Sequence, residues 1–431
     1  MTNKIPVNEH PVTAPGVDIT SRDFWAQPFE ARDEAFRALR DEHPVSWHLP
    51  MDWPVEPDPT EAGFWALVTS RDIAYASTHE KIFSSDSVRW RGITMRPLFP
   101  GQQASADEAP SFMVMDPPLH NEYRRAISSA FTPKAVRRLD EKIRSRAAQI
   151  IDRVAGAGEF DFVAEVSRKL PMQTIGDLVG VPESLIDEFT EAADKFLNQG
   201  DPEVVPDGVS RQDFVREQLG ILSAIGNDLV EFRRKTPADD IATALGRAQI
   251  NGRPLTPDQI TRMTLVLSGA GNDTTKQTTT RTVLALWANP AQREWLMEDF
   301  DARIGQSIEE FVRYATPVIN FARTATQDVE LGGMQIMRGD KVVMFYCSGN
   351  RDETVFDDPW SFDLSRTPPL NHVGFGGGGV HYCLGHLVAK AQLRALFSEI
   401  LTTLKHMEIT GEPVYFLNEF INGVHRLPVR A

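Results

Sequence analysis

The sequence predicts a mainly α-helical protein with small β-sheets, and two observations favour that fold class. Apolar residues recur at helical spacing through most of residues 117–248, with a break at 199–208. A second and much longer helical pattern covers residues 256–289, which at about 1.5 Å per residue would span about 50 Å. Strand-like runs are short by comparison and lie at 44–49, 63–69 and 321–346.

The organisation of the chain indicates a single domain. A length of 431 residues would suggest about three domains at about 150 residues each. However, no repeat, low-complexity block or Ser/Gly-rich linker divides residues 21–431. Residues 1–20 are polar and rich in proline, so we expect a flexible N-terminal tail there. Residues 86–112 show little periodicity, which is typical of a long loop.

Composition excludes several classes of function. The chain holds 45 Lys and Arg against 60 Asp and Glu, a net charge of −15, which argues against nucleic acid as a partner. No apolar run approaches the roughly 18 to 20 residues of a membrane span, and the first residues lack the apolar core of a signal peptide. The two cysteines lie in different contexts and do not suggest a disulfide framework. We therefore expect a cytoplasmic protein with no transmembrane anchor.

The long helix has well-marked ends and an unusual middle. Thr256 is suited to be its N-cap, with Pro257 in the first turn, and Pro290 follows its last residue. The segment GAGNDTT, residues 269–275, places six mediocre or poor helix formers around one alanine, which should weaken or bend the helix. One interpretation is close helix packing through small residues. The other is a groove that carries an acid and an alcohol, Asp273 and Thr274, able to pass protons. The residues alone leave both open.

A second unusual segment, GFGGGGVHYCLGH at residues 374–386, has a very bare backbone just before a cysteine. Such a backbone can turn sharply and lie flat against something bulky. Residues 384–404 continue at helical spacing, so Cys383 lies near a helix start, where free N–H groups lower the pKa of a thiol. A thiolate that faces a flat partner is one interpretation.

Two alternatives to this interpretation are weaker. The glycines match the dinucleotide fingerprint GxGxxG, with Glu399 twenty residues further on, but no strand precedes them and Glu399 falls inside the helical pattern. A free cysteine is also most often a small buried hydrophobic residue. That description fits Cys347, which ends the strand-like run KVVMFYC, better than it fits Cys383.

Together these motifs resemble the cytochrome P-450 family over nearly the whole chain, from about Asp23 to Pro428. The glycine-rich loop that ends in HYCLG and the AGNDTT segment on a long helix are similar to two motifs of the family. Glu310 and Arg313 resemble its ExxR pair, and Arg366 matches the third member of that ion-pair network. The loop departs from the usual pattern because Phe375 stands eight positions before Cys383 rather than seven. This longer loop resembles an actinobacterial subgroup that hydroxylates methyl-branched lipids and sterol side chains.

The resemblance implies a cytochrome P-450 fold with haem b held between the long distal helix and the proximal Cys-ligand loop and helix. Cys383 would ligate the iron, with Phe375 and Gly385 beside it in the loop. A thiolate ligand donates electron density and favours O–O cleavage. The haem propionates would meet four basic side chains, and Asp273 with Thr274 would deliver protons for oxygen activation. The expected propionate ligands are His120, Arg124, Arg323 and His381, and the expected structural ion pairs join Glu310, Arg313 and Arg366.

The resemblance also implies a substrate and partners. The expected function is oxygen insertion into a branched fatty acid, isoprenoid or sterol side chain, at or near a terminal carbon, using O2. Electrons would come from a ferredoxin and its reductase, which requires a local basic patch near Cys383. The alternatives are a haem-binding sensor or carrier without turnover, and a monooxygenase of a smaller terpenoid. Arg89, Arg91 and Arg96 are candidates to meet a substrate carboxylate. The expected pocket is apolar and formed by Ile93, Met95, Val266, Leu267, Ala270, Val318, Ile319 and Phe420.

Overall fold

The computed structural model describes residues 5–51, 53, 61–95, 111–199 and 204–431. Most of the predicted loop, at 96–110, and part of the predicted break, at 200–203, lie outside the described residues.

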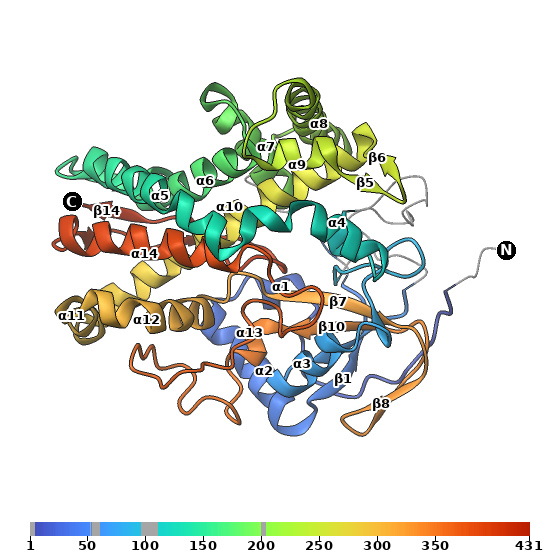
Figure 1. Ribbon diagram of the computed structural model, residues 1–431. Helices are drawn as coiled ribbons and strands as arrows, with labels where there is room; N and C mark the ends of the chain where they lie inside the picture. The colour runs from blue at the N-terminus through green and yellow to red at the C-terminus, as the bar shows by residue number, and fades with distance from the viewer. Residues whose placement is uncertain (1–4, 52, 54–60, 96–110, 200–203) are drawn as a thin grey trace.

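Helices dominate the described chain, which confirms the predicted fold class. In the view of Figure 1, α4 to α9 lie in the upper part, and α5, α14 and α12 lie one below another on the left. The long helix α10 contacts members of both groups, so it forms the centre of the molecule. The helices of this part are α4 Leu119–Ser128, α5 Pro133–Val154, α6 Lys169–Val179, α7 Ile186–Leu197, α8 Arg211–Lys235, α9 Ile241–Arg247, α10 Pro257–Ala288, α11 Pro290–Glu298, α12 Phe300–Ala315 and α14 His386–Thr403. Shorter helical turns are η1 Phe112–Val114, η2 Ser129–Phe131, η3 Val163–Ser167 and η4 Glu183–Leu185.

A mixed five-stranded sheet forms the other part of the molecule, at the lower right of Figure 1. Its strand order is β1-β2-β10-β7-β3, and only the β10–β2 pair is parallel. The strands are β1 Val45–His48, β2 Phe64–Leu67, β3 Phe83–Ser84, β7 Asn320–Ala325 and β10 Lys341–Phe345. The helices around this sheet are α1 Arg22–Trp25, α2 Phe29–Glu42, α3 Ser70–Thr78 and α13 Tyr346–Gly349.

Four smaller sheets complete the fold of the described chain, and the predicted strand-like runs cover only the pair at residues 329–336. β11 Glu408–Ile409, β14 Pro428–Arg430 and β4 Glu159–Asp161 form a three-stranded sheet. The remaining strands pair as hairpins: β5 Gln249–Ile250 with β6 Arg253–Pro254, β8 Val329–Leu331 with β9 Met334–Ile336, and β12 Val414–Tyr415 with β13 Val424–Arg426.

The long helix begins and ends where the sequence predicts. The Thr256 hydroxyl accepts the Gln259 N–H at 3.3 Å and the Gln259 side chain accepts the Thr256 N–H at 2.9 Å, a reciprocal capping box. The poor helix formers do not interrupt α10. A Cβ on Gly269 would lie 2.9 Å from Leu197, and one on Gly271 would lie 3.0 Å from Ile175. Close packing of α10 against α6 and α7 therefore explains the two glycines.

The N-terminal segment differs from the prediction of a flexible tail. Within the described residues 5–20, Ala14 and Ile19 are buried in the core beside α1 and α2. The Thr13 hydroxyl accepts the Trp47 N–H at 2.7 Å, and Nε2 of His10 lies 2.8 Å from Oδ2 of Asp340. A few well-placed anchors hold a segment whose average composition is polar, and composition alone does not show such anchors.

None of the helices in the described part of the chain combines the length and the apolar character needed to cross a bilayer.

Candidate active site

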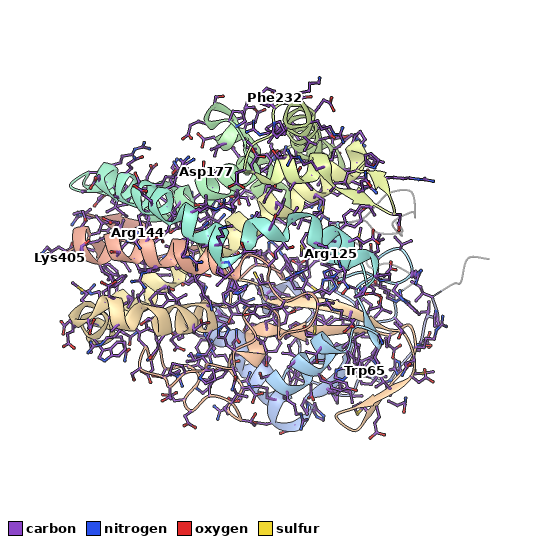
Figure 2. The ribbon with its side chains drawn as sticks, in the orientation of Figure 1. Trp65, Arg125, Arg144, Asp177, Phe232 and Lys405 are labelled. Atoms are coloured by element: carbon purple, nitrogen blue, oxygen red, sulfur yellow. The ribbon has the colours of Figure 1, made fainter. Side chains whose placement is uncertain are left out.

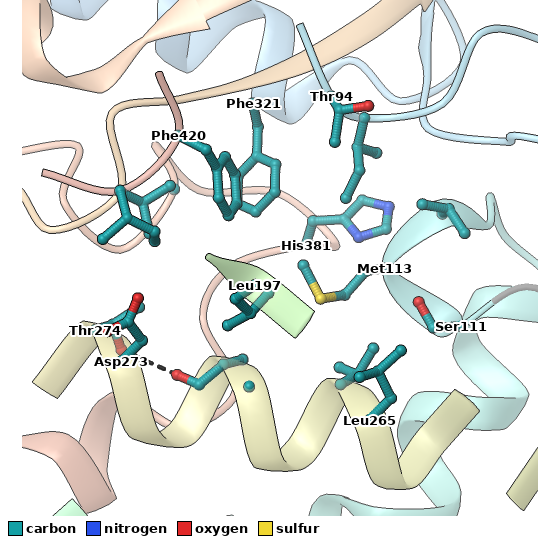
Figure 3. Close-up of a pocket in the computed structure, with 18 of the residues that line it drawn as sticks. Thr94, Ser111, Met113, Leu197, Leu265, Asp273, Thr274, Phe321, His381 and Phe420 are labelled. Atoms are coloured by element: carbon teal, nitrogen blue, oxygen red, sulfur yellow. Dashed lines mark hydrogen bonds between the residues drawn. The ribbon is translucent and has the colours of Figure 1, made fainter. Parts of the chain in front are cut away.

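A cavity of about 1630 Å³ lies between α10 and the glycine-rich loop. Its walls come from segments far apart in the sequence: residues 90–95 and 111–114, the facing ends of α7 and α8, β7, and residues 418–421. Figure 3 shows Asp273 and Thr274 on α10 at one side of this cavity, with Phe321, Phe420 and His381 on the opposite side.

The glycine-rich loop is shaped by α3. Gly376 to Gly379 all have positive φ, between 68° and 104°, a region that favours glycine. The Ser77 hydroxyl donates to the carbonyls of Gly376 and Gly378, at 2.5 and 2.9 Å. A Cβ on Gly379 would lie 2.1 Å from the Ser77 carbonyl oxygen. The bare backbone is therefore required by the turn and by its contact with α3, a reason that the sequence alone did not reveal.

Cys383 lines the cavity at the end of this loop. Its N–H donates to the Phe375 carbonyl at 3.0 Å, and α14 begins three residues later with Gly385 as its N-cap. The pKa of this thiol departs from its usual value in the direction opposite to the prediction. Burial raises the pKa of Cys383, although the N–H groups of Gly385 and His386 act in the opposite direction. The helix end contributes as predicted, but burial outweighs it.

Cys347 lies apart from the cavity lining. It is buried among the side chains of the α1, α2 and sheet core, as a small hydrophobic residue would be. Burial raises the pKa of Cys347 to about 12, and neither cysteine is in a disulfide.

The four predicted propionate ligands lie beside Cys383 and its loop. The rings of His120, on α4, and His381 are 4.3 Å apart, and Nε2 of each is buried without a hydrogen-bond partner. Arg323, on β7, and Arg124, on α4, line the cavity with His381, and Arg124 donates to the Tyr382 carbonyl at 2.7 Å. Burial lowers the pKa of His120, of Arg323 and, most strongly, of His381.

These basic groups fit the anionic edge of a haem. Buried nitrogens without partners are rare in folded proteins and call for a hydrogen-bond partner. Two carboxylates close to His120, His381 and Arg323 would satisfy them, and haem carries two propionates. The residues of the described chain therefore fit the cofactor: Cys383 would be the one to hold the iron, and Phe375 and Gly385 lie in the same loop.

Asp273 and Thr274 lie on α10 where they line the cavity. The Thr274 hydroxyl donates to the Ala270 carbonyl at 2.9 Å. Asp273 is fully buried, its Oδ1 lies 2.6 Å from Lys276 Nζ, and its Oδ2 has no hydrogen-bond partner. Burial raises the pKa of Asp273, against the pull of Lys276. Lys276 thus fixes Oδ1 of Asp273, while Oδ2 has no partner among the described residues.

Sequence reasoning missed Lys276, which pairs with this acid, and Asp194, which pairs with Lys276. Asp194, on α7, lies 3.1 Å from Lys276 Nζ and accepts the Asn272 side chain at 2.9 Å. Burial alone would lower the pKa of Lys276. The carboxylates of Asp194 and Asp273 outweigh burial and raise this pKa above its usual value, so Lys276 stays charged. The Asp273–Lys276 spacing was visible on the predicted helix, whereas Asp194 comes from a helix about 80 residues earlier.

Glu310, Arg313 and Arg366 meet in the interior, away from the cavity lining. Arg313 donates to both oxygens of Glu310, at 2.6 and 2.7 Å, and Arg366 Nε lies 3.4 Å from Glu310 Oε1. Arg313 also donates to three backbone carbonyls of residues 350–361, which fastens α12 to that segment.

Seven of the eight predicted pocket residues line the cavity, and Ile319 does not. Ile319 packs instead into the core beside the sheet, because its neighbour Val318 takes the cavity side of the chain. Arg91 is also used differently from the expectation, since it donates to the carbonyls of Gly339 and Pro6. Arg89 is exposed and lies 3.6 Å from Asp86, and Arg96 lies outside the described residues.

Comparisons with known proteins decide the family. A methyl-branched lipid omega-hydroxylase of Mycobacterium tuberculosis is 37% identical over 99% of this chain and 97% of its own. The chain belongs to the cytochrome P450 family. The family model "Cytochrome P450" matches residues 221–424. A steroid C26-monooxygenase of Mycobacterium bovis is 34% identical over 96% of this chain and 92% of its own. A Mycobacterium marinum cytochrome P450, solved in complex with pseudoionone, is 40% identical with a TM-score of 0.90 over 99% of both chains.

Membership of this family confirms the main functional predictions. The protein is a P450 monooxygenase that acts on hydrophobic compounds, and its cofactor is haem b. These relatives carry the names of monooxygenases, so the alternative of a haem-binding sensor without turnover has no support from them.

Proposed function

We propose that this P450 hydroxylates a long hydrophobic substrate, a branched fatty acid, an isoprenoid or a sterol side chain, at or near a terminal carbon. The observation that carries the proposal is the shape of the cavity along α10. Thr274 lines one part and Arg262 lines another, and their separation of twelve positions corresponds to about 18 Å along the helix axis. The α10 side chains between them include Leu265, Val266 and Ala270. Each buried CH₂ contributes about 0.8 kcal/mol, so a long chain binds there with little polar recognition.

The relatives support this class of substrate. One is named for methyl-branched lipids, another for carbon 26 of steroids, and a third was solved with pseudoionone. The names describe attack near the end of a hydrocarbon chain in the first two cases. A smaller terpenoid is the second candidate, because the structural relative with 40% identity holds pseudoionone.

When bound, haem b supplies an iron centre that uses O2, two electrons and two protons to insert one oxygen atom into a C–H bond and release the other as water. Cys383 is proposed to hold the iron, and His120, Arg124, Arg323 and His381 to hold the propionates. The hydroxyl of Thr274 is proposed to pass protons into the cavity. Asp273 is proposed to supply them through its free Oδ2, while Lys276 fixes its other oxygen.

The head of a fatty acid would meet Arg262. Its Nε is buried and has no hydrogen-bond partner in the described part of the chain, and Arg262 lines the cavity on the same helix as Thr274. This guanidinium replaces Arg89 and Arg91 as the candidate for the substrate carboxylate, and the expectation for Arg96, which lies outside the described residues, stays a prediction.

We expect Arg262→Gln to weaken the binding of a branched fatty acid by at least about tenfold, because a hydrogen bond to a charged group contributes about 1.5 to 3 kcal/mol. The binding of the matching alcohol should not change. Arg216→Gln is the control, since Arg216 also lines the cavity but is largely exposed and paired with Asp213. Spectral titration of the haem measures both affinities. Equal weakening for acid and alcohol would contradict the assignment of Arg262.

The substrate proposal is tested by incubating the enzyme and a surrogate ferredoxin system with methyl-branched fatty acids, farnesol-type isoprenoids and cholestenone. Mass spectrometry then locates the new oxygen. Hydroxylation near the end of a chain supports the proposal. Product from compact or polar compounds alone, with no binding shift from any lipid, would contradict it and leave the monooxygenase activity standing.

We also propose that a ferredoxin, reduced by a ferredoxin reductase, delivers the electrons. Helix α5 packs along α14, which begins just after Cys383, and Figure 2 shows Arg144 on α5 and Arg125 on α4. Exposed cations here would attract an acidic partner despite the net charge of −15. The cytoplasmic location and the absence of a nucleic-acid partner stay predictions from composition.

A further inference from the structure

A second, smaller cavity of about 160 Å³ lies beside the active site, between α2, α10 and the β12–β13 hairpin. Its lining includes Trp25 and Phe29 from the N-terminal helices, Tyr415 from the hairpin, and the guanidinium groups of Arg32 and Arg281. On one side the cavity meets Gln27 and Pro28, which are exposed, so solutes can reach it from solvent.

Both arginines are buried with few partners. Arg32 and Arg281 are each only 7% exposed. Among the described residues, Arg32 makes one hydrogen bond, at 3.4 Å to the side chain of Asn422, and its Nε has no partner. Within the same part of the chain, Arg281 has a single ion pair, at 3.9 Å to Glu30, and its Nη1 has no partner. Two cations with ten N–H donors between them therefore make very few hydrogen bonds among the described residues.

The surrounding side chains do not balance this charge. Both guanidinium groups lie about 5 to 6 Å from the ring of Phe29, and each contacts one further aromatic ring. Such cation–π contacts contribute about 0.5 to 2 kcal/mol, less than the cost of two neighbouring buried cations. Glu30, the carboxylate paired with Arg281, has a side chain that is 59% exposed, so water screens it. Burial lowers the pKa of Arg32 to about 10, and the nearby Arg281 adds to this effect.

We propose that this cavity is a binding site for a small oxyanion of the phosphate or sulfate class, held between Arg32 and Arg281. The volume resembles that of an engineered cavity of roughly 150 Å³ that holds benzene, so a tetrahedral oxyanion fits. Guanidinium groups present forked donors that match such an anion, and a charge of −2 neutralises both cations.

The site is connected to the active-site cavity through one turn of the chain. Ile421 lines both cavities, and the adjacent Phe420 lines the active site. Asn422, which contacts Arg32, is also tied to the backbone of Ala315 and Pro317. An anion that fixes Arg32 therefore fixes the turn that carries Phe420, and we expect it to tighten the binding of a hydrophobic substrate.

The experiment uses the haem-loaded enzyme and potassium phosphate, with potassium chloride at equal ionic strength as the salt control. Phosphate should raise the thermal unfolding midpoint of the wild type and give a saturable calorimetric isotherm, because a ligand that binds only the folded state stabilises it. Arg281→Gln should abolish both effects. Arg293→Gln is the matched control, since Arg293 also lies over an aromatic ring, Trp287 at 4.7 Å, and does not line the cavity.

A gain-of-affinity variant keeps the test decisive if Arg281→Gln folds poorly. Glu30→Gln removes the competing carboxylate and should tighten phosphate binding about two- to fivefold, the range of an exposed ion pair. Equal responses to phosphate and chloride, or no change in Glu30→Gln, would overturn the anion site. Phosphate binding that leaves the affinity for substrate unchanged would overturn the coupling through the 420–422 turn.

Discussion

Glu310→Ala is expected to give haem-free or aggregated protein rather than a slow enzyme. Glu310 is fully buried. Its carboxylate accepts two hydrogen bonds from the Arg313 guanidinium and one from the Asp363 N–H, at 3.0 Å. Its removal leaves the Arg313 guanidinium buried without a counter-charge, which costs about 3 to 5 kcal/mol. That is a large part of the roughly 5 to 15 kcal/mol that stabilises a native protein. Haem content per protein and the thermal unfolding midpoint measure the effect.

Glu298→Ala is the control for this variant, because Glu298 pairs with Arg303 but its side chain is 67% exposed. A pair so placed contributes at most about 1 kcal/mol, so the control should fold and bind haem. A Glu310→Ala protein that is well folded, loaded with haem and merely slow would show that Glu310 acts in catalysis and not in stability.

Thr274→Ala is expected to separate electron consumption from product formation. The variant should still consume NADH, while product per NADH falls by at least about tenfold, because a positioned proton donor contributes about 10²- to 10⁴-fold. The missing electrons should be recovered as hydrogen peroxide. The physical reason is that the Thr274 hydroxyl lines the cavity next to Asp273 and is placed to pass protons into it.

Two further variants make this result specific. Thr279→Ala removes another buried hydroxyl of α10, one that donates to the Thr275 carbonyl at 2.9 Å and does not line the cavity, so coupling should hold. Thr274→Ser restores a hydroxyl and should recover most of the product. Unchanged coupling in Thr274→Ala would count against the proton path.

The parts of the fold that local sequence determines were predictable. The capping residue Thr256 and the apolar spacing beyond it place α10 correctly, and the short strand-like runs give β1, β2 and the strands between residues 320 and 345. The single-domain assignment of residues 21–431 stays a prediction. The roles of the site residues also stay proposals, although the structure gathers Cys383, His381, Arg323 and Thr274 around one cavity.

Features that depend on distant partners were not predictable. Asp194 reaches Lys276 only because α7 packs on α10. Arg32 and Arg281 line the same small cavity although about 250 residues separate them in the sequence. Even the pKa of Cys383 was predicted with the wrong sign, since the motif shows the helix start but not the extent of burial. Local patterns thus identify the chemistry, while packing sets the charge balance around it.

The absorbance spectrum of the reduced protein under carbon monoxide tests the central claim most directly. If Cys383 is the thiolate ligand of the haem iron, wild type and Cys347→Ser should show the red-shifted Soret band of a thiolate complex. Cys383→His should lack that band while still binding haem. A Cys347→Ser protein that loses the band, beside a Cys383→His protein that keeps it, would contradict the account.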